Sequence, residues 1–290
     1  MSKIYCNIYN GIGNQLFGYA LGLYLSKKYK KKLVIDLTKL TTINFQCRLG
    51  LKKDTFREFE LDKIGFTDEI VQFNFKNFLK KIPRLSKKNR LYTDFRKSHN
   101  EQNLIDIDID VDIYCLGWGD FKIVNEVLPD LRTRFTPKFK ITEKISSTKN
   151  LIIERNAVAV HLRGTDFLDK KISGYAIGLC TDDYYSNAIR FINEKIENPY
   201  FIIFSDDTEY VKQKLDIENS YVVTGNEGYE DLYLMSLCKH FILANSTFSF
   251  WAAILNTNQN KIVCVPEHWF NSQRRQADYI PDEWTKIAID

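Results

Sequence analysis

The sequence predicts an α/β protein with two Rossmann-like domains that face a cleft. Two observations carry this prediction. The chain opens with a strand–turn–helix–strand pattern that has glycines in its first turn, and its second half alternates short apolar strands with helices. Such alternation specifies parallel sheets covered by helices. The 290 residues suit two modest domains, and Lys, Thr and Ser cluster from Pro137 to Asn150, so the predicted domains span 1–145 and 146–290.

The first β-α-β unit occupies residues 3–36. A β-favouring run at 3–9 predicts a strand, residues 10–13 a turn, and apolar residues at helical spacing a helix over 14–31. Lysine clusters end this helix, where cations suit the carboxyl-terminal dipole. The next strand is predicted at 33–36.

The remainder of this domain is less regular. Residues 40–100 predict only short helices and loops, whereas residues 104–116 alternate apolar and acidic side chains and predict a strand. The acidic positions are Asp106, Asp108, Asp110 and Asp112. A D-x-D pair can hold a metal–nucleotide complex. We favour a solvated strand face, because an acid at every second position is what such a face requires.

The second domain continues the alternation. Strands are predicted at 157–161, 200–204, 221–223, 241–244 and 262–265, the last strand, and helices at 182–194, 205–215, 229–239 and 247–255. Asp182 is predicted to cap the first of these helices. Ligands of open α/β sheets bind beyond the carboxyl ends of the strands. The candidate ligand loops are therefore 10–15, 161–169, 205–207 and 245–249.

Composition narrows the class of protein. Lys plus Arg number 41 against 37 Asp plus Glu, and the net charge of +4 does not indicate a nucleic-acid partner. No window reaches the roughly 18 apolar residues of a membrane helix, and the start lacks a signal-peptide pattern. The six cysteines form no C-x-x-C pair, so we expect buried free thiols in a reducing cytosol. The four histidines form no zinc motif, and no metal site is expected.

The first candidate loop holds Gly11, Gly13, Asn14 and Gln15. Two glycines let a backbone approach a ligand closely, and the following helix presents free N–H groups to an anion. Leu16 stands where a dinucleotide fingerprint needs a third glycine, which excludes that motif. A tight turn without a ligand is the alternative interpretation.

The second candidate loop follows the strand at 157–161. His161 and Arg163 point to the same side of the chain, and Asp166 comes three residues later. The planar fork of an Arg suits phosphate, so we favour a functional role over a surface Arg–Asp pair.

Two further loops carry polar groups at strand ends. The apolar helix at 247–255 is opened by Asn245, Ser246, Thr247 and Phe248. A helix N-terminus of this kind binds phosphate well, although plain capping is the alternative. Asp206 and Asp207 follow another strand, where they either bind a ligand or cap a helix.

Four segments of this chain resemble the α-1,2-fucosyltransferases, inverting enzymes that use GDP-fucose. The G-x-G-N-Q-x-F-x-Y-A segment of that family matches residues 11–20, and its H-x-R-x-x-D motif matches 161–166. Its S-D-D segment matches 205–207, and its long D-L-x-L-M-S-x-C-K-H-x-I-x-A-N-S-x-F-S-x-W run matches 231–251. Two positions depart from the family pattern. Gly164 stands where many members have a second Arg, and Gly117-Trp118-Gly119-Asp120 stands where members often show G-Y-x-Q-S.

The resemblance implies two Rossmann-like domains in the GT-B arrangement, with no required metal. The second domain would hold GDP-fucose, with Arg163 on the diphosphate and His161 and Asp231 on the guanosine half. The other donor-binding residues would be Asp206, Asn245, Ser246, Thr247 and Phe248. The first domain would present the acceptor through Gly11, Gly13, Gln15 and Trp118.

The candidate catalytic residues are Arg163, Asp166 and Asn14. Arg163 would stabilise the negative charge that grows on the leaving diphosphate, because preorganised donors act on developing charge. Asp166 is a candidate base. Alternatively, Asn14 positions the acceptor hydroxyl while the departing phosphate takes its proton.

The expected reaction is transfer of L-fucose to the 2-hydroxyl of a terminal β-galactoside in a glycan or O-antigen-type polysaccharide. The acceptor would be an oligosaccharide or a lipid-linked glycan, and the enzyme would be cytoplasmic, with peripheral membrane association as a further expectation. One alternative is a metal-dependent glycosyltransferase that uses the acidic strand face. A nucleotide-dependent oxidoreductase is disfavoured by the missing glycine. The non-enzyme alternative is a GDP- or sugar-binding protein without catalytic power.

Overall fold

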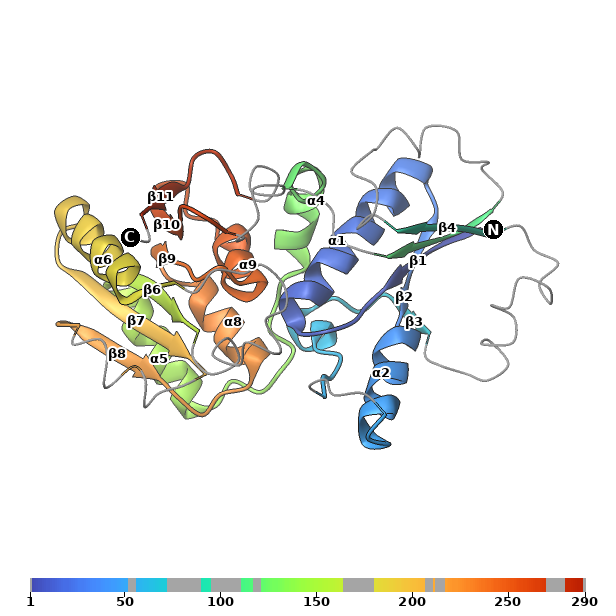
Figure 1. Ribbon diagram of the computed structural model, residues 1–290, viewed down its shortest axis with the longest axis horizontal. Coiled ribbons are helices and arrows are strands. Elements are labelled where there is room, and N and C mark those ends of the chain that lie inside the picture. Colours follow the sequence, from blue (N-terminus) through green and yellow to red (C-terminus); the bar gives the residue numbers. More distant parts are fainter. Residues whose placement is uncertain are drawn as a thin grey trace. The chain divides into compact units, whose positions relative to one another are not determined.

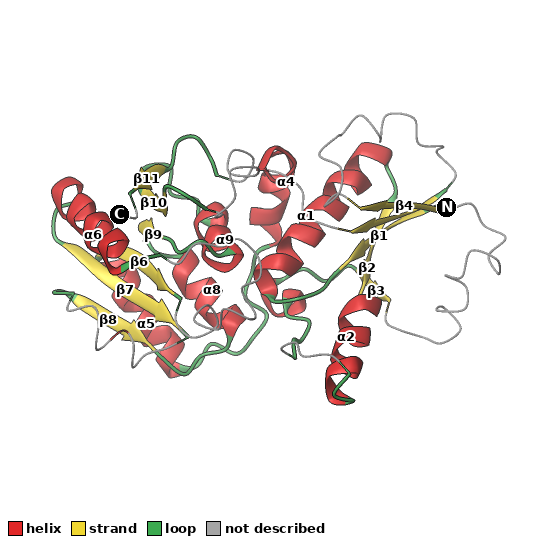
Figure 2. Ribbon diagram, in the orientation of Figure 1, coloured by secondary structure: helices red, strands yellow, loops and turns green. Residues whose placement is uncertain are grey.

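The computed structural model describes residues 2–51, 56–71, 90–94, 111–116, 121–163, 180–206, 211, 217–269 and 280–288. The chain divides into two compact units, Met1–Lys138 and Phe139–Asp290. Each unit contains its own parallel β-sheet with helices packed on it (Figures 1 and 2). The predicted α/β fold class is confirmed.

The first unit has a five-stranded sheet in the order β3-β2-β1-β5-β4, with every neighbouring pair parallel. Its elements are β1 (Lys3–Asn7), α1 (Ile12–Tyr29), β2 (Lys32–Asp36), α2 (Thr38–Arg48), the 3₁₀ helix η1 (Leu61–Ile64), β3 (Glu69–Val71), β4 (Arg90–Asp94), β5 (Asp112–Leu116) and α4 (Phe121–Arg134). The predicted strand over 104–116 is observed as β5 at its carboxyl end, and residues 104–110 lie outside the described residues.

Helix α1 begins two residues earlier than the sequence predicts. Asn10 adopts a left-handed conformation (φ 62°), which completes the turn, and Gly11 becomes the N-cap of the helix. Gly13 therefore lies within the first turn of α1 and not in the preceding loop. Lys30, also left-handed, ends the helix.

The close approach of α1 to the sheet depends on Gly22. A Cβ atom at this position would lie 2.5 Å from Cβ of Cys6 and 2.9 Å from Cδ1 of Leu33. Real Cβ contacts are longer than this, so only glycine lets α1 lie so close to β1 and β2. The packing fixes where the amino end of α1 stands relative to the carboxyl end of β1.

The second unit has a six-stranded sheet in the order β11-β10-β9-β6-β7-β8, again with every neighbouring pair parallel. Its elements are α5 (Glu143–Glu154), β6 (Asn156–Leu162), α6 (Asp182–Lys195), β7 (Pro199–Ser205), β8 (Ser220–Val223), α8 (Gly228–Ser236), β9 (His240–Ile242), α9 (Thr247–Leu255), β10 (Val263–Pro266) and β11 (Thr285–Ile287). Counted along the unit this order is 6-5-4-1-2-3, the Rossmann order.

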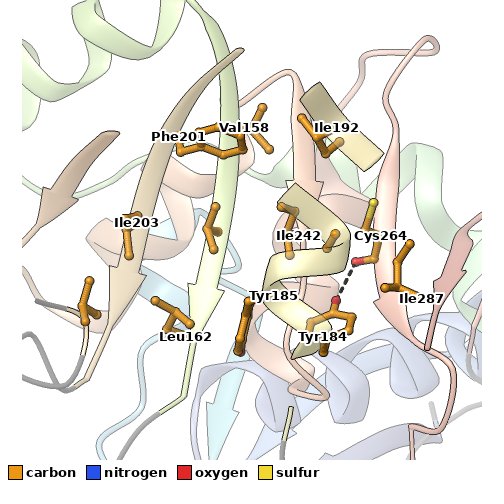
Figure 3. Close-up of a cluster of buried hydrophobic side chains, with 13 residues drawn as sticks. Val158, Leu162, Tyr184, Tyr185, Ile192, Phe201, Ile203, Ile242, Cys264 and Ile287 are labelled. Atoms are coloured by element: carbon orange, nitrogen blue, oxygen red, sulfur yellow. Dashed lines mark hydrogen bonds between the residues drawn. The ribbon is translucent and has the colours of Figure 1, made fainter. Parts of the chain in front are cut away.

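The core of the second unit lies between α6 and one face of the sheet (Figure 3). Alternate residues of β6, Val158, Val160 and Leu162, point into this core. The hydroxyl of Tyr184 on α6 donates to the carbonyl of Leu243 at 2.6 Å and contacts the carbonyl of Cys264 at 3.3 Å. Because side chains alternate along a strand, His161 and Arg163 point to the opposite side of β6.

Three details of the second unit differ from the sequence predictions. The cap of α6 is Thr181, whose side chain accepts from the backbone N–H of Tyr184, and not Asp182. A hydroxyl one residue earlier reaches the third helical N–H, and Asp182 then falls in the first turn. Helix α8 ends at Ser236, earlier than predicted, and the short strand β11 follows the strand that the sequence predicts as the last one.

The cysteines are free thiols, and Cys6, Cys115, Cys238 and Cys264 are buried. Cys47 and Cys180 are only partly covered, so the expectation of burial holds for four of the six. In the described part of the chain, we find no helix with the length and apolar character needed to cross a bilayer.

Candidate functional site

In the second unit the strand order reverses between β6 and β9. β7 and β8 follow β6 on one side of it in the sheet, whereas β9, β10 and β11 extend the sheet on its other side. β6 and β9 are parallel neighbours, with Val160 paired to Ile242. Ligands bind in the crevice at such a reversal, beyond the carboxyl ends of the strands. The segments that leave β6 and β9 are therefore the ones expected to meet a ligand.

Arg163 and the amino end of α9 come together at this reversal. Ser246 is the N-cap of α9, and its Oγ accepts the backbone N–H of Phe248 at 3.3 Å. Nη1 of Arg163 donates to the same Oγ at 3.2 Å. Accepting both bonds uses the two lone pairs of the hydroxyl and leaves its proton as a donor. A guanidinium, a hydroxyl and a helix N-terminus therefore meet at one point, which is an arrangement suited to an anion.

His161 lies next to this point but is buried and neutral. Its Nδ1 is 3.0 Å from Oγ of Ser249, one turn into α9, and its ring lies 5.5 Å from that of Phe248. Burial, and to a lesser degree the nearby Arg163 cation, lower the pKa of His161 to about 3. At neutral pH the imidazole therefore supplies no positive charge. It holds the amino end of α9 against the end of β6.

Asn245 is 5% exposed and packs within the loop between β9 and α9. Its Nδ2 donates to the carbonyl of Trp269 at 3.4 Å, and its Oδ1 lies 3.8 Å from Sγ of Cys180. These contacts join three loops at the same sheet edge. They indicate that the Asn245 side chain positions this loop, and its direct contact with the donor stays a prediction.

Two acidic residues lie further along the same edge. Asp206 is exposed directly after β7, the neighbour of β6. Asp231 lies in the first turn of α8, the helix that follows β8 in the chain. Nδ2 of Asn226 donates to Oδ1 of Asp231 at 2.9 Å, while burial raises the pKa of this carboxyl to about 6. A half-buried carboxylate that titrates near neutrality is typical of a binding site.

In the first unit the strand order reverses between β1 and β5. Gly11 lies in the segment that leaves β1. A Cβ atom added to Gly11 would meet no other atom within 4 Å, and its φ of −71° suits any residue. Neither packing nor backbone conformation therefore requires glycine here. The open space at Gly11 is compatible with a ligand. Asn14 is half-buried, and its backbone N–H bonds to the carbonyl of Gly11 at 2.9 Å.

Gln15 is completely buried, and its side chain is used within the protein. Nε2 donates to the carbonyls of Asn10 at 2.9 Å and Glu58 at 2.7 Å, and Oε1 accepts the backbone N–H of Glu60 at 3.1 Å. The expectation that Gln15 contacts an acceptor is wrong, because its amide lies in the interior. It ties the turn after β1 to the segment that precedes η1.

Several residues singled out in the sequence lie outside the described residues: Trp118, Gly164, Asp166, Asp207 and the acids at 106–110. Of the acidic strand face, Asp112 is described, and its Oδ1 accepts the backbone N–H of Lys3 at 2.9 Å. In the parts of the chain that can be described, no three His, Cys, Asp or Glu side chains gather as a metal site.

Ser249 belongs to the candidate loop 245–249, but the sequence reasoning gave it no role of its own. It lies three residues after Ser246, so both hydroxyls are on one face of α9. Ser246 contacts Arg163 and Ser249 contacts His161. The S-x-x-S spacing at a helix start was the available signal.

Comparison with known proteins places these features in context. Residues 3–288 match the model of Glycosyl transferase family 11. An alpha-1,2-colitosyltransferase from Escherichia coli is 30% identical over 99% of this chain and 99% of its own length. The O-antigen biosynthesis glycosyltransferase WbnK of Escherichia coli is 28% identical over 98% and 100% of the two chains.

The fold is shared with solved glycosyltransferase structures. The structure of NodZ alpha-1,6-fucosyltransferase co-crystallised with GDP aligns with a TM-score of 0.54 at 13% identity, over 88% of this chain and 93% of that one. A structure of fucosyltransferase NodZ from Bradyrhizobium aligns with a TM-score of 0.52 at 12% identity, over the same shares of the two chains. At this level of identity the likeness concerns the fold, and it confirms the predicted GT-B-like class.

Proposed function

The chain belongs to glycosyltransferase family 11, and from this membership and the geometry of its second unit we propose that it transfers L-fucose from GDP-fucose to the 2-hydroxyl of a terminal β-galactoside. The observation that carries the proposal is the meeting of Arg163 with Ser246 at the amino end of α9. This meeting lies at the strand-order reversal where a nucleotide diphosphate is expected.

Arg163 and α9 would act on the leaving group. In an inverting transfer the acceptor hydroxyl attacks the anomeric carbon on the face opposite the nucleotide, and the transition state resembles an oxocarbenium ion. Negative charge then grows on the diphosphate. The guanidinium, the Ser246 hydroxyl and the first N–H groups of α9 are already oriented, and each such donor contributes about 3–4 kcal/mol to the transition state. On this proposal the reaction needs no metal, because the guanidinium of Arg163 neutralises the charge that grows on the diphosphate.

Asp231 would bind the guanine end of the donor. The Watson–Crick edge of guanine presents N–H donors, which a carboxylate accepts when it is ionised. With a pKa of about 6, Asp231 is mostly ionised at neutral pH and becomes protonated in mild acid. His161, being buried and neutral, would not carry charge and would support the Arg163–Ser246 end of the site through α9.

The first unit would supply the acceptor side. The open space at Gly11 and the half-buried Asn14 lie at the carboxyl edge of its sheet, where an acceptor sugar could rest. Asn14 would orient the attacking hydroxyl. Asp166 and the departing phosphate remain the two candidates for taking its proton, and turnover of Asp166→Asn distinguishes them.

The matched variants Arg163→Ala and Arg155→Ala test the diphosphate role. Both arginines flank β6, but Arg155 precedes it at the other end of the strand and stacks over the Tyr200 ring at 5.0 Å. We expect Arg163→Ala to lower turnover about 100- to 1,000-fold, and Arg155→Ala to leave it unchanged. Near wild-type turnover of Arg163→Ala would remove this residue from the mechanism.

Colitose is the second candidate sugar, favoured by the full-length match to the alpha-1,2-colitosyltransferase. Colitose lacks a hydroxyl that fucose has. A site that hydrogen-bonds this hydroxyl would reject colitose by a large factor, whereas an apolar contact there would favour it. Competition between the two nucleotide-linked sugars on a panel of β-galactosides, followed by linkage analysis, identifies donor and acceptor. GDP binding without transfer would instead support the non-catalytic alternative, and loss of activity in chelator would support a metal-dependent one.

A further inference from the structure

Asn226 and Asp231 form a polar pair at the amino end of α8. Nδ2 of Asn226 donates to Oδ1 of Asp231 at 2.9 Å, and both side chains are half-buried. An ionised carboxylate accepts hydrogen bonds and does not donate them, so the amide atom that faces Asp231 is the nitrogen. One of the two hydrogens on Nδ2 is used in this bond, and the other remains.

The pair keeps hydrogen-bonding groups that the protein itself does not use. Among the described residues, the side chains of Asn226 and Asp231 make no hydrogen bond besides the one between them. Oδ2 of Asp231 therefore has no protein donor there, and the second hydrogen of Nδ2 has no protein acceptor. Because both side chains are only half-buried, a ligand can reach these groups.

The loop between β8 and α8 is held at both of its ends. At its start, Nζ of Lys144 in α5 donates to the carbonyl of Thr224. Gly225 then adopts a left-handed conformation (φ 63°), and a Cβ atom at this position would lie 3.2 Å from Nζ of Lys144. At the end of the loop, the backbone N–H of Glu227 donates to Oε2 of Glu230 at 2.8 Å. The pair is therefore preorganised, and little ordering is needed when a ligand binds.

The pair lies on the edge of the sheet where the diphosphate is expected. β8 and β9 belong to one parallel sheet, so the helices that follow them, α8 and α9, both begin at its carboxyl edge. The two helices pack against each other (Figure 1). The axes of packed helices lie about 8–10 Å apart. The Asn226–Asp231 pair at the start of α8 and Ser246 at the start of α9 are therefore neighbours, as the base and the diphosphate of one nucleotide require.

We propose that the Asn226–Asp231 pair selects guanine, with Nδ2 of Asn226 donating to O6 of the base while Asp231 accepts from its N1–H and N2–H groups. One acceptor followed by two donors is the Watson–Crick edge of guanine. Adenine has an amino donor where guanine has O6, so the free hydrogen of Asn226 would meet another donor. A site built to hydrogen-bond one group rejects an analogue that lacks it. The inference rests on the proposed guanine-nucleotide donor and adds a specificity-determining residue, Asn226.

Calorimetric titration of the full chain with GDP and 6-thio-GDP tests the contact at O6. Sulfur is a weak acceptor, so 6-thio-GDP keeps the N–H groups of guanine and weakens only the contact at position 6. We expect the wild type to bind 6-thio-GDP about tenfold more weakly than GDP, and Asn226→Ala to bind the two nucleotides alike. Inosine diphosphate lacks the 2-amino group that Asp231 would bind, so both proteins should bind it more weakly than GDP.

Asn187→Ala is the matched control. Asn187 is also half-buried and also has one side-chain hydrogen bond, which Nη2 of Arg190 donates at 2.8 Å, but it lies on α6. This variant should retain the wild-type affinity for all three nucleotides.

The ratio of the two affinities separates base selection from a structural role of Asn226. A loosened loop would weaken GDP and 6-thio-GDP equally and leave their ratio unchanged. The same preference for GDP in the wild type and in Asn226→Ala would therefore overturn the proposal, as would equal binding of GDP and 6-thio-GDP by the wild type. Absence of GDP binding by the wild type would overturn the proposed function as well.

Discussion

The neutral, buried imidazole of His161 makes the second unit sensitive to acid. In an unfolded chain the pKa of His is about 6.5, whereas burial lowers the pKa of His161 to about 3. At a pH between these two pKa values, the imidazole is protonated in the unfolded state and neutral in the folded state. This contribution to stability is fully present above the unfolded pKa and is lost as pH falls toward the folded one.

The size of the loss follows from the two pKa values. At pH 5 the unfolded imidazole lies about 1.5 pH units below its pKa, and the folded one is almost wholly neutral. At about 1.4 kcal/mol per pH unit, the contribution of His161 makes the free energy of unfolding about 2 kcal/mol lower at pH 5 than at pH 7. An uncharged substitute, His161→Asn, retains a polar atom near the position of Nδ1 and should remove this pH dependence.

Urea unfolding at pH 7 and pH 5, followed by tryptophan fluorescence, measures the effect on the full chain. Trp251, Trp269 and Trp284 lie in the second unit, so the signal reports mainly on that unit. We expect the loss of unfolding free energy between the two pH values to be about 2 kcal/mol smaller in His161→Asn than in the wild type. Equal losses in both proteins would refute the assignment of a buried neutral His161.

Asp231 should behave in the opposite sense. Its raised pKa of about 6 means that ionisation of the carboxyl lowers the free energy of unfolding. Asp231→Asn should therefore stabilise the protein by up to roughly 3 kcal/mol at pH 7 and by little below pH 4, and it should weaken GDP binding measured by calorimetry. The same stabilisation at both pH values would contradict this reasoning. Gly22→Ala should destabilise the first unit by about 1–3 kcal/mol in thermal unfolding, because its Cβ would collide with Cys6. Its matched control, Gly11→Ala, should change stability by less than about 1 kcal/mol and yet lower transfer activity; full activity would argue against an acceptor beside Gly11. Gln15→Leu should cost about 1–3 kcal/mol, because three partly buried backbone groups lose the partner that the Gln15 amide supplies, and a smaller loss would indicate that water replaces the amide.

Local patterns in the sequence were sufficient for several elements. The predicted helix over 247–255 has the bounds of α9, because a hydroxyl N-cap followed by a continuous apolar run is a signal contained in a few neighbouring residues. The alternation along β6 likewise predicted that His161 and Arg163 share a side, and both contact α9. Where two polar residues competed for one cap, as Thr181 and Asp182 do, the sequence pattern did not decide between them.

The sequence by itself determined that this is an α/β chain whose strands end in residues suited to bind a nucleotide. Strand and helix periodicity and the residues at strand ends are local properties of the sequence. The tertiary structure alone decided what those residues do. It placed β6 beside β9, which brings Arg163 to a serine 83 residues away in the chain. It also buried His161 and turned Gln15 inward toward a segment more than 40 residues distant. Pairing and burial depend on partners far along the chain, and no local pattern contains them.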